Sequence, residues 1–497
     1  MSKQGKKRKQ SKKRGKVKGA EKYFDVVNGF TVPVYSVNEH FMNLLEDAAF
    51  LPANETEAAT ATKPPEEIII VDSASAAVAS EPAVVTLKVP QLTGTSVCIY
   101  FQVHQPFRLR TYNFDQIGAD HYYEHYDQNV EILNKVADKC YLPTNAKILE
   151  LLMRHKGRFK VAYSISGVAL EQFELYRPDV IRSFQALAAT GYVEMLDETY
   201  YHSLSFLYSK EEFDRQVQMH KKKIKELFDL EPTIFRNTEL IFNNVLAAHV
   251  ASLGYKGMLC EGVDRYLNNR TPNQVFTSPG VENFSLLLKN YRLSDDIAFR
   301  FSNHEWENWP LTADKFSQWL HDHAGNAETI NLFMDYETFG EHQWKETGIF
   351  NFLDNLPEMI LDHPDFYFRS PSEVFAAHPA RDVYDVPEFT SWADAERDLS
   401  AWNENEMQKE ALEKIYALEK AVKATGNEDL LKVWGKLQTS DHFYYMSTKF
   451  WADGDVHKYF SPFASPYDAG IYYMNVISDL EKTVTEQVPE KETAPPN

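Results

Sequence analysis

Cysteine is scarce in this sequence, which has three cysteines in 497 residues: Cys98, Cys140 and Cys260. Disulfide frameworks need an even set of cysteines, and zinc knuckles need closely spaced pairs. This odd, scattered set argues against both. We expect reduced thiols in a cytoplasmic protein.

Long hydrophobic runs are also absent. No stretch approaches the roughly 18 consecutive apolar residues of a membrane-spanning helix. The basic start of the sequence is not followed by the apolar segment of a secretory signal. No glycine-rich phosphate loop follows any predicted strand, which weakens a nucleotide-binding interpretation. We therefore expect no membrane span, no secretion and no nucleotide site.

Charge is distributed unevenly along the chain. The net charge is −20, yet residues 1–20 hold ten Lys or Arg and no acidic residue. The remaining residues therefore carry about −30, counting every charged side chain as ionised at pH 7. Such an acidic body repels phosphate, so we expect no nucleic-acid partner. The basic arm could contact RNA, anionic lipid or an import receptor, but a solvated disordered tail is the simpler interpretation, and its role is unknown.

The composition divides the chain into four parts. Residues 1–94 are predicted to be a disordered extension and linker, because Ala, Thr, Glu and Pro dominate its second half and bury too little apolar area to offset chain entropy. Residues 95–375 are predicted to form the catalytic domain, 376–482 a helical domain and 483–497 a disordered tail.

Short β-rich runs alternate with helical patterns in the second part. Residues 210–228, for example, place Phe213, Val217 and Ile224 on one side of a predicted helix. Buried strands separated by helices predict a parallel sheet, and seven such units favour an incomplete TIM-type β/α barrel over a doubly wound sheet. The predicted strands are 96–103, 159–165, 192–196, 233–236, 256–260, 283–288 and 329–335.

The strand signal fades after about residue 375. Residues 404–425 carry apolar side chains at helical spacing, and Gly426-Asn427 then gives a stop signal. Residues 428–437 and 465–482 are also predicted helices. Together they predict a helical bundle that packs against the barrel.

Two carboxylates follow predicted strands of the barrel. Glu239 follows the fourth strand and Asp335 ends the seventh, and chemistry in such barrels collects at the carboxyl ends of the strands. Glycoside hydrolysis needs one carboxyl to protonate the leaving oxygen and another to attack the sugar or activate water. A lone strand-end acid is also often a helix cap or an ion-pair partner. Three acids, Asp335, Glu337 and Glu341, could instead bind a hard cation.

Other polar or aromatic residues near these ends are candidates for substrate binding. His104 could also be a satisfied core histidine, and His342 a surface residue. Most large aromatic side chains belong to a core rather than to a sugar site. The candidates are His104, Gln105, His202, Arg236, Tyr336, His342 and Trp402.

The sequence resembles glycoside hydrolase family 57, and within it the α-amylase-like branch, over about residues 96–480. The order and spacing of several motifs carry the resemblance. These are FQVHQP at 101–106, GYVEML at 191–196, FRNTEL at 235–240, MDYETFGEHQ at 334–343, DHFYYMSTK at 441–449 and the stretch 391–411.

The resemblance implies a seven-stranded β/α barrel followed by a helical bundle, and retention of configuration through a covalent glycosyl-enzyme. It implies Glu239 as the nucleophile and Asp335 as the general acid and base. The first motif departs from the usual His-x-His-Gln-Pro, because Gln102 replaces the first histidine. Sugar-binding positions fall on His104, Glu194 and His442.

With the resemblance, the sequence predicts a cytoplasmic, retaining hydrolase of α-1,4-glucans such as starch, glycogen or maltodextrin. The chemistry needs no cofactor, and no metal is expected. A 4-α-glucanotransferase or branching enzyme differs only in the second acceptor. A metal-dependent deacetylase using His104 and Asp335 is a third possibility, although no His-x-x-x-His pair lies near the acids. A catalytically silent glucan-binding protein is the fourth.

Overall fold

The computed structural model describes residues 23–27, 30–34, 94–449 and 461–487. The chain separates into two compact units, Met1–Leu51 and Pro52–Asn497. In the first unit, β1 (Tyr23–Val27) pairs with β2 (Phe30–Val34) as an antiparallel hairpin.

The hairpin departs from the disorder expected for residues 1–94. Asn28-Gly29, between its strands, is the sequence signal of a two-residue hairpin turn. The remaining predictions for residues 1–22 and 35–93 lie outside the described residues, as do those for 488–497.

The second unit contains a first sheet around the longest strand, β3 (Thr95–Val103). Its order is β10-β3-β4-β5, with β4 at Val161–Ile165, β5 at Val193–Met195 and β10 at Thr329–Asp335. These strands are parallel, and β11 (Phe366–Phe368) pairs with the start of β3. Every residue of β3 and β4 is buried, which explains why the sequence shows them as continuous apolar runs.

A second sheet has the order β12-β8-β9-β7-β6. Strands β6 (Ile234–Arg236), β7 (Gly257–Glu261) and β9 (Ser285–Lys289) are parallel. β8 (Val275–Thr277) is antiparallel to β9, and β12 (Asp382–Val383) pairs with β8. β8 and β12 were not predicted.

The two sheets approach each other at two places. Asp197, just after β5, makes a parallel bridge with Phe235 of β6. At the second place, the backbone N–H of Asn290, just after β9, donates to the carbonyl oxygen of Asn331 in β10 at 2.9 Å. All seven predicted strands are therefore present, and the α/β class with parallel sheets is confirmed.

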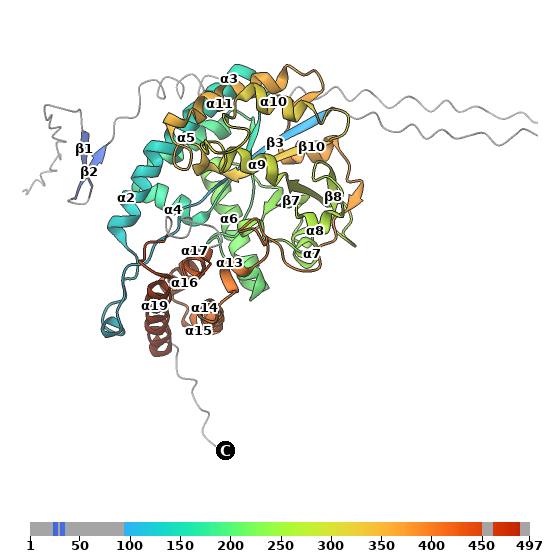
Figure 1. Ribbon diagram of the computed structural model, residues 1–497. Coiled ribbons are helices and arrows are strands. Elements are labelled where there is room, and N and C mark those ends of the chain that lie inside the picture. The colour runs from blue at the N-terminus through green and yellow to red at the C-terminus, as the bar shows by residue number, and fades with distance from the viewer. Residues whose placement is uncertain (1–22, 28–29, 35–93, 450–460, 488–497) are drawn as a thin grey trace, which may run out of the picture. The chain divides into compact units, whose positions relative to one another are not determined.

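Helices flank these strands (Figure 1). The helix predicted over 210–228 is α6 (Lys210–Phe228), where Ser209 caps the amino end and Asp229 ends the helix in the left-handed conformation. The others include α2 (Tyr126–Val136), α3 (Leu142–His155), α4 (Gly167–Tyr176), α5 (Pro178–Ala189), α7 (Asn244–Ser252), α8 (Asp264–Leu267), α9 (Tyr291–Ala298), α10 (Ala313–His321), α11 (Ile349–Leu361) and α12 (Pro371–Ala377).

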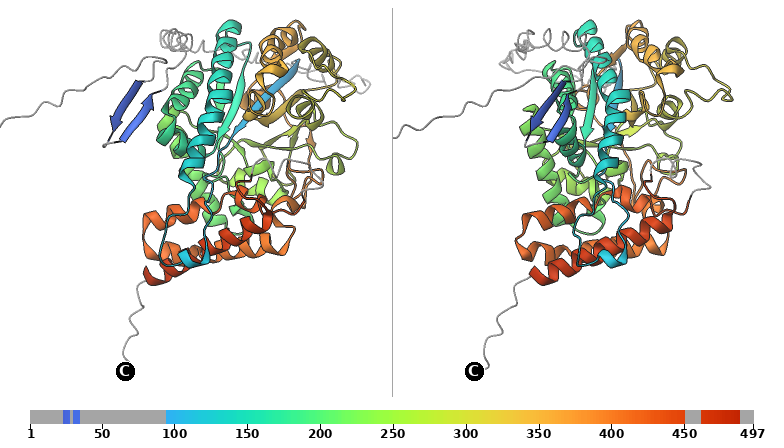
Figure 2. Two further views of the ribbon diagram at one scale, coloured as in Figure 1. Left: turned by 60° about the vertical axis from the view of Figure 1, so that its left-hand side comes forward. Right: turned by 90° about the vertical axis from the view of Figure 1, so that its left-hand side faces the viewer.

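The carboxyl-terminal helices gather at one end of this unit (Figure 2). The predicted helix over 404–425 is two helices, and Gly426 ends the second with a φ of 62°, as the stop signal indicated. Buried Trp434 donates its indole N–H to the carbonyl oxygen of Ile415 at 2.7 Å within their shared core. The helices are α13 (Ser400–Asn403), α14 (Glu406–Ala417), α15 (Glu419–Thr425), α16 (Glu428–Lys436), α17 (Ser440–Tyr444) and α19 (Pro466–Gln487).

No helix in the described part of the chain combines the length and the apolar character needed to cross a bilayer.

Candidate active site

A cavity of about 450 Å³ opens where the carboxyl ends of β3, β6 and β10 meet α13 and α17. Its size suits a small-molecule or oligosaccharide site. Both predicted carboxylates line it, as do five of the residues predicted to bind substrate. Together these are Glu239, Asp335, His104, Gln105, His202, His342 and Trp402.

Glu239 lies in a short 3-10 turn, Thr238–Leu240, directly after β6. Its φ of 56° and ψ of 26° are left-handed, a conformation that costs free energy for a residue with a Cβ. Its carboxylate has two partners. Oε1 lies 3.1 Å from Nε2 of His202, and Oε2 accepts a 2.6 Å hydrogen bond from the indole N–H of Trp392. The strained turn therefore presents the carboxylate to the cavity in a fixed orientation.

The environment of Glu239 favours its ionised form. Burial raises the pKa of the carboxyl, but the hydrogen bond and charge of His202, the charge of Arg236 and the hydrogen bond from Trp392 together lower it below its ordinary value. Hydrogen bonding to a carboxylate stabilises its charged form. Glu239 is thus a carboxylate at neutral pH.

Asp335 is the last residue of β10 and pairs with Gln102 of β3 in the sheet register. Burial, followed by the negative charge of Glu239, raises the pKa of Asp335 to about 6, while Arg236 opposes the shift. The cavity therefore contains one carboxyl held ionised and one whose proton is retained to a higher pH. Carboxyl pairs whose pKa values are pushed apart divide acid and nucleophile roles.

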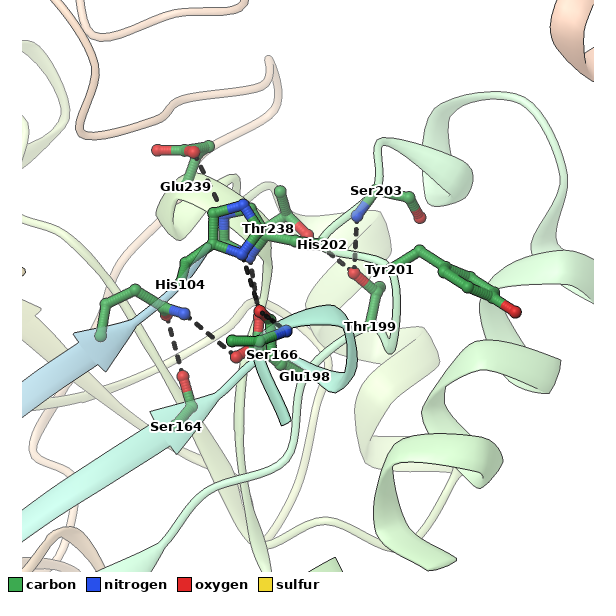
Figure 3. Close-up of polar contacts among 12 residues, drawn as sticks. His104, Ser164, Ser166, Glu198, Thr199, Tyr201, His202, Ser203, Thr238 and Glu239 are labelled. Atoms are coloured by element: carbon green, nitrogen blue, oxygen red, sulfur yellow. Dashed lines mark hydrogen bonds and ion pairs between the residues drawn. The ribbon is translucent and has the colours of Figure 1, made fainter. Parts of the chain in front are cut away.

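Two histidines stack beside Glu239. The rings of His104 and His202 have their centroids 4.0 Å apart and are 21° from parallel. His104 places Nδ1 2.7 Å from the hydroxyl of Ser166 and Nε2 2.8 Å from the carboxylate of Asp441 in α17. Figure 3 shows the two rings overlapping, with Glu239 and Glu198 on opposite sides of His202. The helical segment thus contributes directly to the site through Asp441.

Glu194 does not reach this cavity, contrary to the prediction. It is the central residue of the three-residue strand β5, and its carboxylate accepts two 3.0 Å hydrogen bonds, from the backbone N–H and the hydroxyl of Ser372. It lines a separate cavity of about 330 Å³ with Lys160 and Tyr192, which precede β4 and β5. A mid-strand position directs this side chain to α12 rather than to the strand ends.

Tyr336, which was predicted to bind substrate, does not line the cavity either. Its side chain is fully buried, and its hydroxyl donates to Oδ1 of Asn145 in α3 at 2.6 Å. Its ring packs against Phe101 and Tyr163. It is a core residue, because it points away from the face that its neighbour Asp335 presents to the cavity.

Arg236 and His442 lie behind the cavity wall. Arg236 is fully buried, with its guanidinium 4.8 Å from the ring centre of Trp392. His442 is buried with Nε2 3.2 Å from the carbonyl oxygen of Lys436, and burial lowers its pKa to about 4. Neither lines the cavity, so the structure does not support direct substrate contact by these two residues.

Several cavity or neighbouring residues were missed by the prediction. Trp392 lies in the matched stretch 391–411, Asp441 begins the last motif, and Glu198 follows the third strand, so each had a usable signal. Lys289 ends β9 and also lines the cavity. This missed set also includes Asp295, Arg397, Phe299 and Tyr444.

Within the described ranges, no group of three or more His, Cys, Asp or Glu side chains is placed to hold a metal ion. The cysteines Cys98, Cys140 and Cys260 are buried free thiols.

Comparison with solved structures shows the fold. A branching enzyme from Thermococcus kodakaraensis aligns with a TM-score of 0.58 at 12% identity, covering 80% of this chain and 92% of its own. An alpha-amylase from Thermotoga maritima gives 0.51 at 13% identity, covering 80% and 95%. The 4-alpha-glucanotransferase from Thermococcus litoralis gives 0.53 at 16% identity, covering 70% of this chain and 56% of its own.

Sequence comparison shows the family. A protein named "Putative alpha-amylase" from Methanocaldococcus jannaschii is 45% identical over 406 residues, which are 79% of this chain and 85% of that protein. The family model described as "Glycosyl hydrolase family 57" matches residues 98–387. The chain therefore belongs to glycosyl hydrolase family 57.

Proposed function

We propose that this protein is a retaining, α-amylase-like glycoside hydrolase that cleaves α-1,4 bonds in starch, glycogen or maltodextrin. Glu239 is the nucleophile and Asp335 the general acid and base. One observation carries the proposal: the two carboxyls line one cavity, and their surroundings shift their pKa values in opposite directions.

The reaction proceeds in two displacements. A carboxylate oxygen of Glu239 attacks the anomeric carbon, the glycosidic C–O bond breaks, and Asp335 gives its proton to the departing oxygen. Asp335 then takes a proton from water, which attacks the same carbon and releases Glu239 as a carboxylate. The same anomeric carbon is inverted twice, so the configuration is retained. No cofactor takes part.

The cavity wall supports sugar binding on the substrate side. His104, Gln105, His202 and His342 offer polar atoms, and Trp402 offers an aromatic face. We assign these five residues to substrate contact, and Arg236 to an electrostatic role behind Trp392.

The finer architecture belongs to the same proposal. We propose that the seven parallel strands close as one barrel, and that residues 376–482 form a separate helical domain whose Asp441 completes the site. A cytoplasmic location is consistent with three reduced, buried thiols.

Product analysis on maltoheptaose and amylose tests the reaction. Shorter maltooligosaccharides with new reducing ends are expected, and proton NMR at early times should show the α-anomer first. Longer oligosaccharides without a net gain of reducing ends would instead identify a glucanotransferase. New branches on the glucan, which a debranching enzyme would release, would identify a branching enzyme.

Two controls separate the remaining alternatives. Glu239→Gln should form no product, which links the activity to this cavity. A wild-type protein that binds amylose yet forms no product would be a silent glucan-binding protein. Activity toward an acetylated sugar that is lost with a chelator would identify a metal-dependent deacetylase.

A further inference from the structure

His202 lies between two carboxylates. Its Nδ1 is 2.8 Å from Oε2 of Glu198, and its Nε2 is 3.1 Å from Oε1 of Glu239 (Figure 3). A neutral imidazole has one N–H and one lone pair, so it can donate to only one of them. Two such contacts need either a doubly protonated ring or a proton on one of the two carboxyls.

The surroundings of Glu198 favour its ionised form. Glu198 is fully buried, and Oε1 accepts a 3.1 Å hydrogen bond from the side-chain amide of Gln102. The hydrogen bond from His202 on the other oxygen stabilises the same charge. Each oxygen of Glu198 therefore faces a hydrogen-bond donor. Neither of these partners is an acceptor to which a protonated Glu198 would have to donate.

The amide of Gln102 is itself fixed in orientation. Its Oε1 accepts from the hydroxyl of Tyr100 at 2.7 Å and lies 2.9 Å from the hydroxyl of Ser164. Its Nε2 therefore faces Glu198 and, at 3.3 Å, the carbonyl oxygen of Val103. A glutamine here donates without titrating, whereas the histidine usual at this motif position could gain or lose a proton beside Glu198.

We propose that Glu198, oriented by Gln102, is a positioning residue that keeps His202 an imidazolium cation bonded to Glu239 throughout the reaction. The role of Glu239 as nucleophile comes from the proposed function. When Glu239 becomes an ester with the sugar, it loses its negative charge and no longer stabilises the protonated form of His202. Glu198 is not consumed, so it retains the cation that stabilises the Glu239 carboxylate as the ester is cleaved.

The charged groups around this pair are compatible with one cation in the histidine stack. His104, whose ring stacks on that of His202, is neutral near pH 7, because burial and then the charge of His202 lower the pKa of His104. In the free enzyme the pKa of His202 is raised to about 9: burial opposes the shift, but the hydrogen bonds and charges of Glu198 and Glu239 exceed it. The other groups that act on His202 or its carboxylates are Asp441, Arg236, His220 and Asp335.

The direct test is the titration of His202 by NMR of the histidine-labelled full chain, with the signal assigned by its loss in His202→Gln. In the wild type the ring should stay charged to about pH 9. In Glu198→Gln the midpoint should fall by about 1–3 pH units, the effect of removing one close opposite charge. An unshifted midpoint, or a neutral ring at pH 7 in the wild type, would overturn the proposal.

A kinetic test uses an α-glucosyl fluoride, whose leaving group needs no proton. Hydrolysis by the wild type should fall at high pH as His202 loses its proton. In Glu198→Gln this limb should move down by about 1–3 pH units. The acid limb of the pH–rate profile should not move, because His202 is protonated at those low pH values in both proteins. Glu198→Asp keeps the charge, so its alkaline limb should lie between those of the wild type and Glu198→Gln.

Asp479→Asn is the matched control. Asp479 of α19 is also buried and pairs with a histidine, with Oδ2 2.7 Å from Nδ1 of His121, but neither residue lines the cavity. A purely structural role for Glu198 predicts equal effects in both variants. We expect Asp479→Asn to lower the midpoint of thermal unfolding while leaving the His202 titration in place.

If Glu198→Gln fails to fold, Gln102→Met provides the second test. It removes the amide that orients the Glu198 carboxylate, so the hydrogen bond between Glu198 and Nδ1 of His202 should weaken. The His202 midpoint should then fall in the same direction by a smaller amount, and no change would count against the proposal. The NMR measurement does not depend on turnover. Its failure is therefore distinguishable from failure of the proposed function, which would appear as a trapped sugar on a carboxylate other than Glu239.

Discussion

Trp392 holds Glu239 at two points. Its indole N–H donates to Oε2 of Glu239 at 2.6 Å, and its backbone N–H donates to the carbonyl oxygen of the same residue at 3.1 Å. One bond fixes the carboxylate and the other fixes the left-handed turn that presents it. The strain of that turn is thus balanced by a residue from a distant part of the chain.

Trp392→Phe should separate the hydrogen bond from the ring. The aromatic face over Arg236 remains, but a charge-assisted hydrogen bond of about 1.5–3 kcal/mol is lost. We expect kcat/KM on maltoheptaose to fall about 10- to 150-fold. The acid limb should move to higher pH, because the pKa of Glu239 rises without this donor.

Trp434→Phe is the control for that variant. It removes an indole hydrogen bond of 2.7 Å within the helical core, away from the cavity. It should lower the unfolding temperature and leave the acid limb where it is. A shift of the acid limb equal to that of Trp392→Phe would show that general loosening, rather than the bond to Glu239, causes it.

The parts of the fold that the sequence predicted are those encoded locally. The seven strands and the helix over 210–228 show as apolar runs or as helical spacing, and both depend on nearby residues. The hairpin around Asn28-Gly29 was overlooked because the composition of residues 1–94 outweighed a two-residue turn signal. β8 has three residues and β12 has two, which is too few to show a periodic pattern.

Some of the segments predicted to form the site reach the cavity through a neighbour of the predicted residue. Adjacent side chains in extended backbone point to opposite faces, so Asp335 faces the cavity and Tyr336 the core. In α17 the resemblance pointed to His442, which is buried behind the cavity wall, whereas its neighbour Asp441 lines the cavity. The partnership of Trp392 with Glu239 joins residues 153 positions apart, and no local pattern contains it.

Arg236→Met should change the pH profile without a matching loss of stability. Within the described residues, none of the three guanidinium nitrogens of Arg236 has a hydrogen-bond partner, so its burial is costly. Its charge lowers the pKa of Asp335 and of Glu239. Removing it should move both limbs of kcat/KM to higher pH, while urea unfolding shows stability equal to or above that of the wild type. Unmoved limbs would contradict the electrostatic role.

Phe299→Ala should weaken the binding of long substrates. Phe299 follows α9, lines the cavity, and is 63% exposed, which suits an aromatic platform for a sugar ring. KM for maltoheptaose should rise several-fold, with a smaller effect on maltotriose and little change in kcat. Phe114→Ala is the control, because Phe114 is 80% exposed and does not line the cavity. Equal effects on both substrates would place Phe299 outside the outer part of the binding site.

The pH dependence of starch hydrolysis tests the assignment of Asp335. A general acid must hold its proton, so activity should be lost as pH rises through the pKa of about 6 that burial and Glu239 give this carboxyl. The alkaline limb of kcat/KM should therefore lie near pH 6. Asp335→Asn should abolish starch hydrolysis at every pH.

The same variant also locates the nucleophile. An α-glucosyl fluoride leaves without protonation, so Asp335→Asn should still form the glycosyl-enzyme. Water attack should then be slow, because no base remains to activate it. Peptide mass spectrometry should find the sugar on Glu239, and Glu239→Gln combined with Asp335→Asn should show no adduct. A sugar on Glu337 or Glu198, or full starch activity in Glu239→Gln, would contradict the assignment of Glu239, because a retaining site has one carboxylate that carries the covalent intermediate.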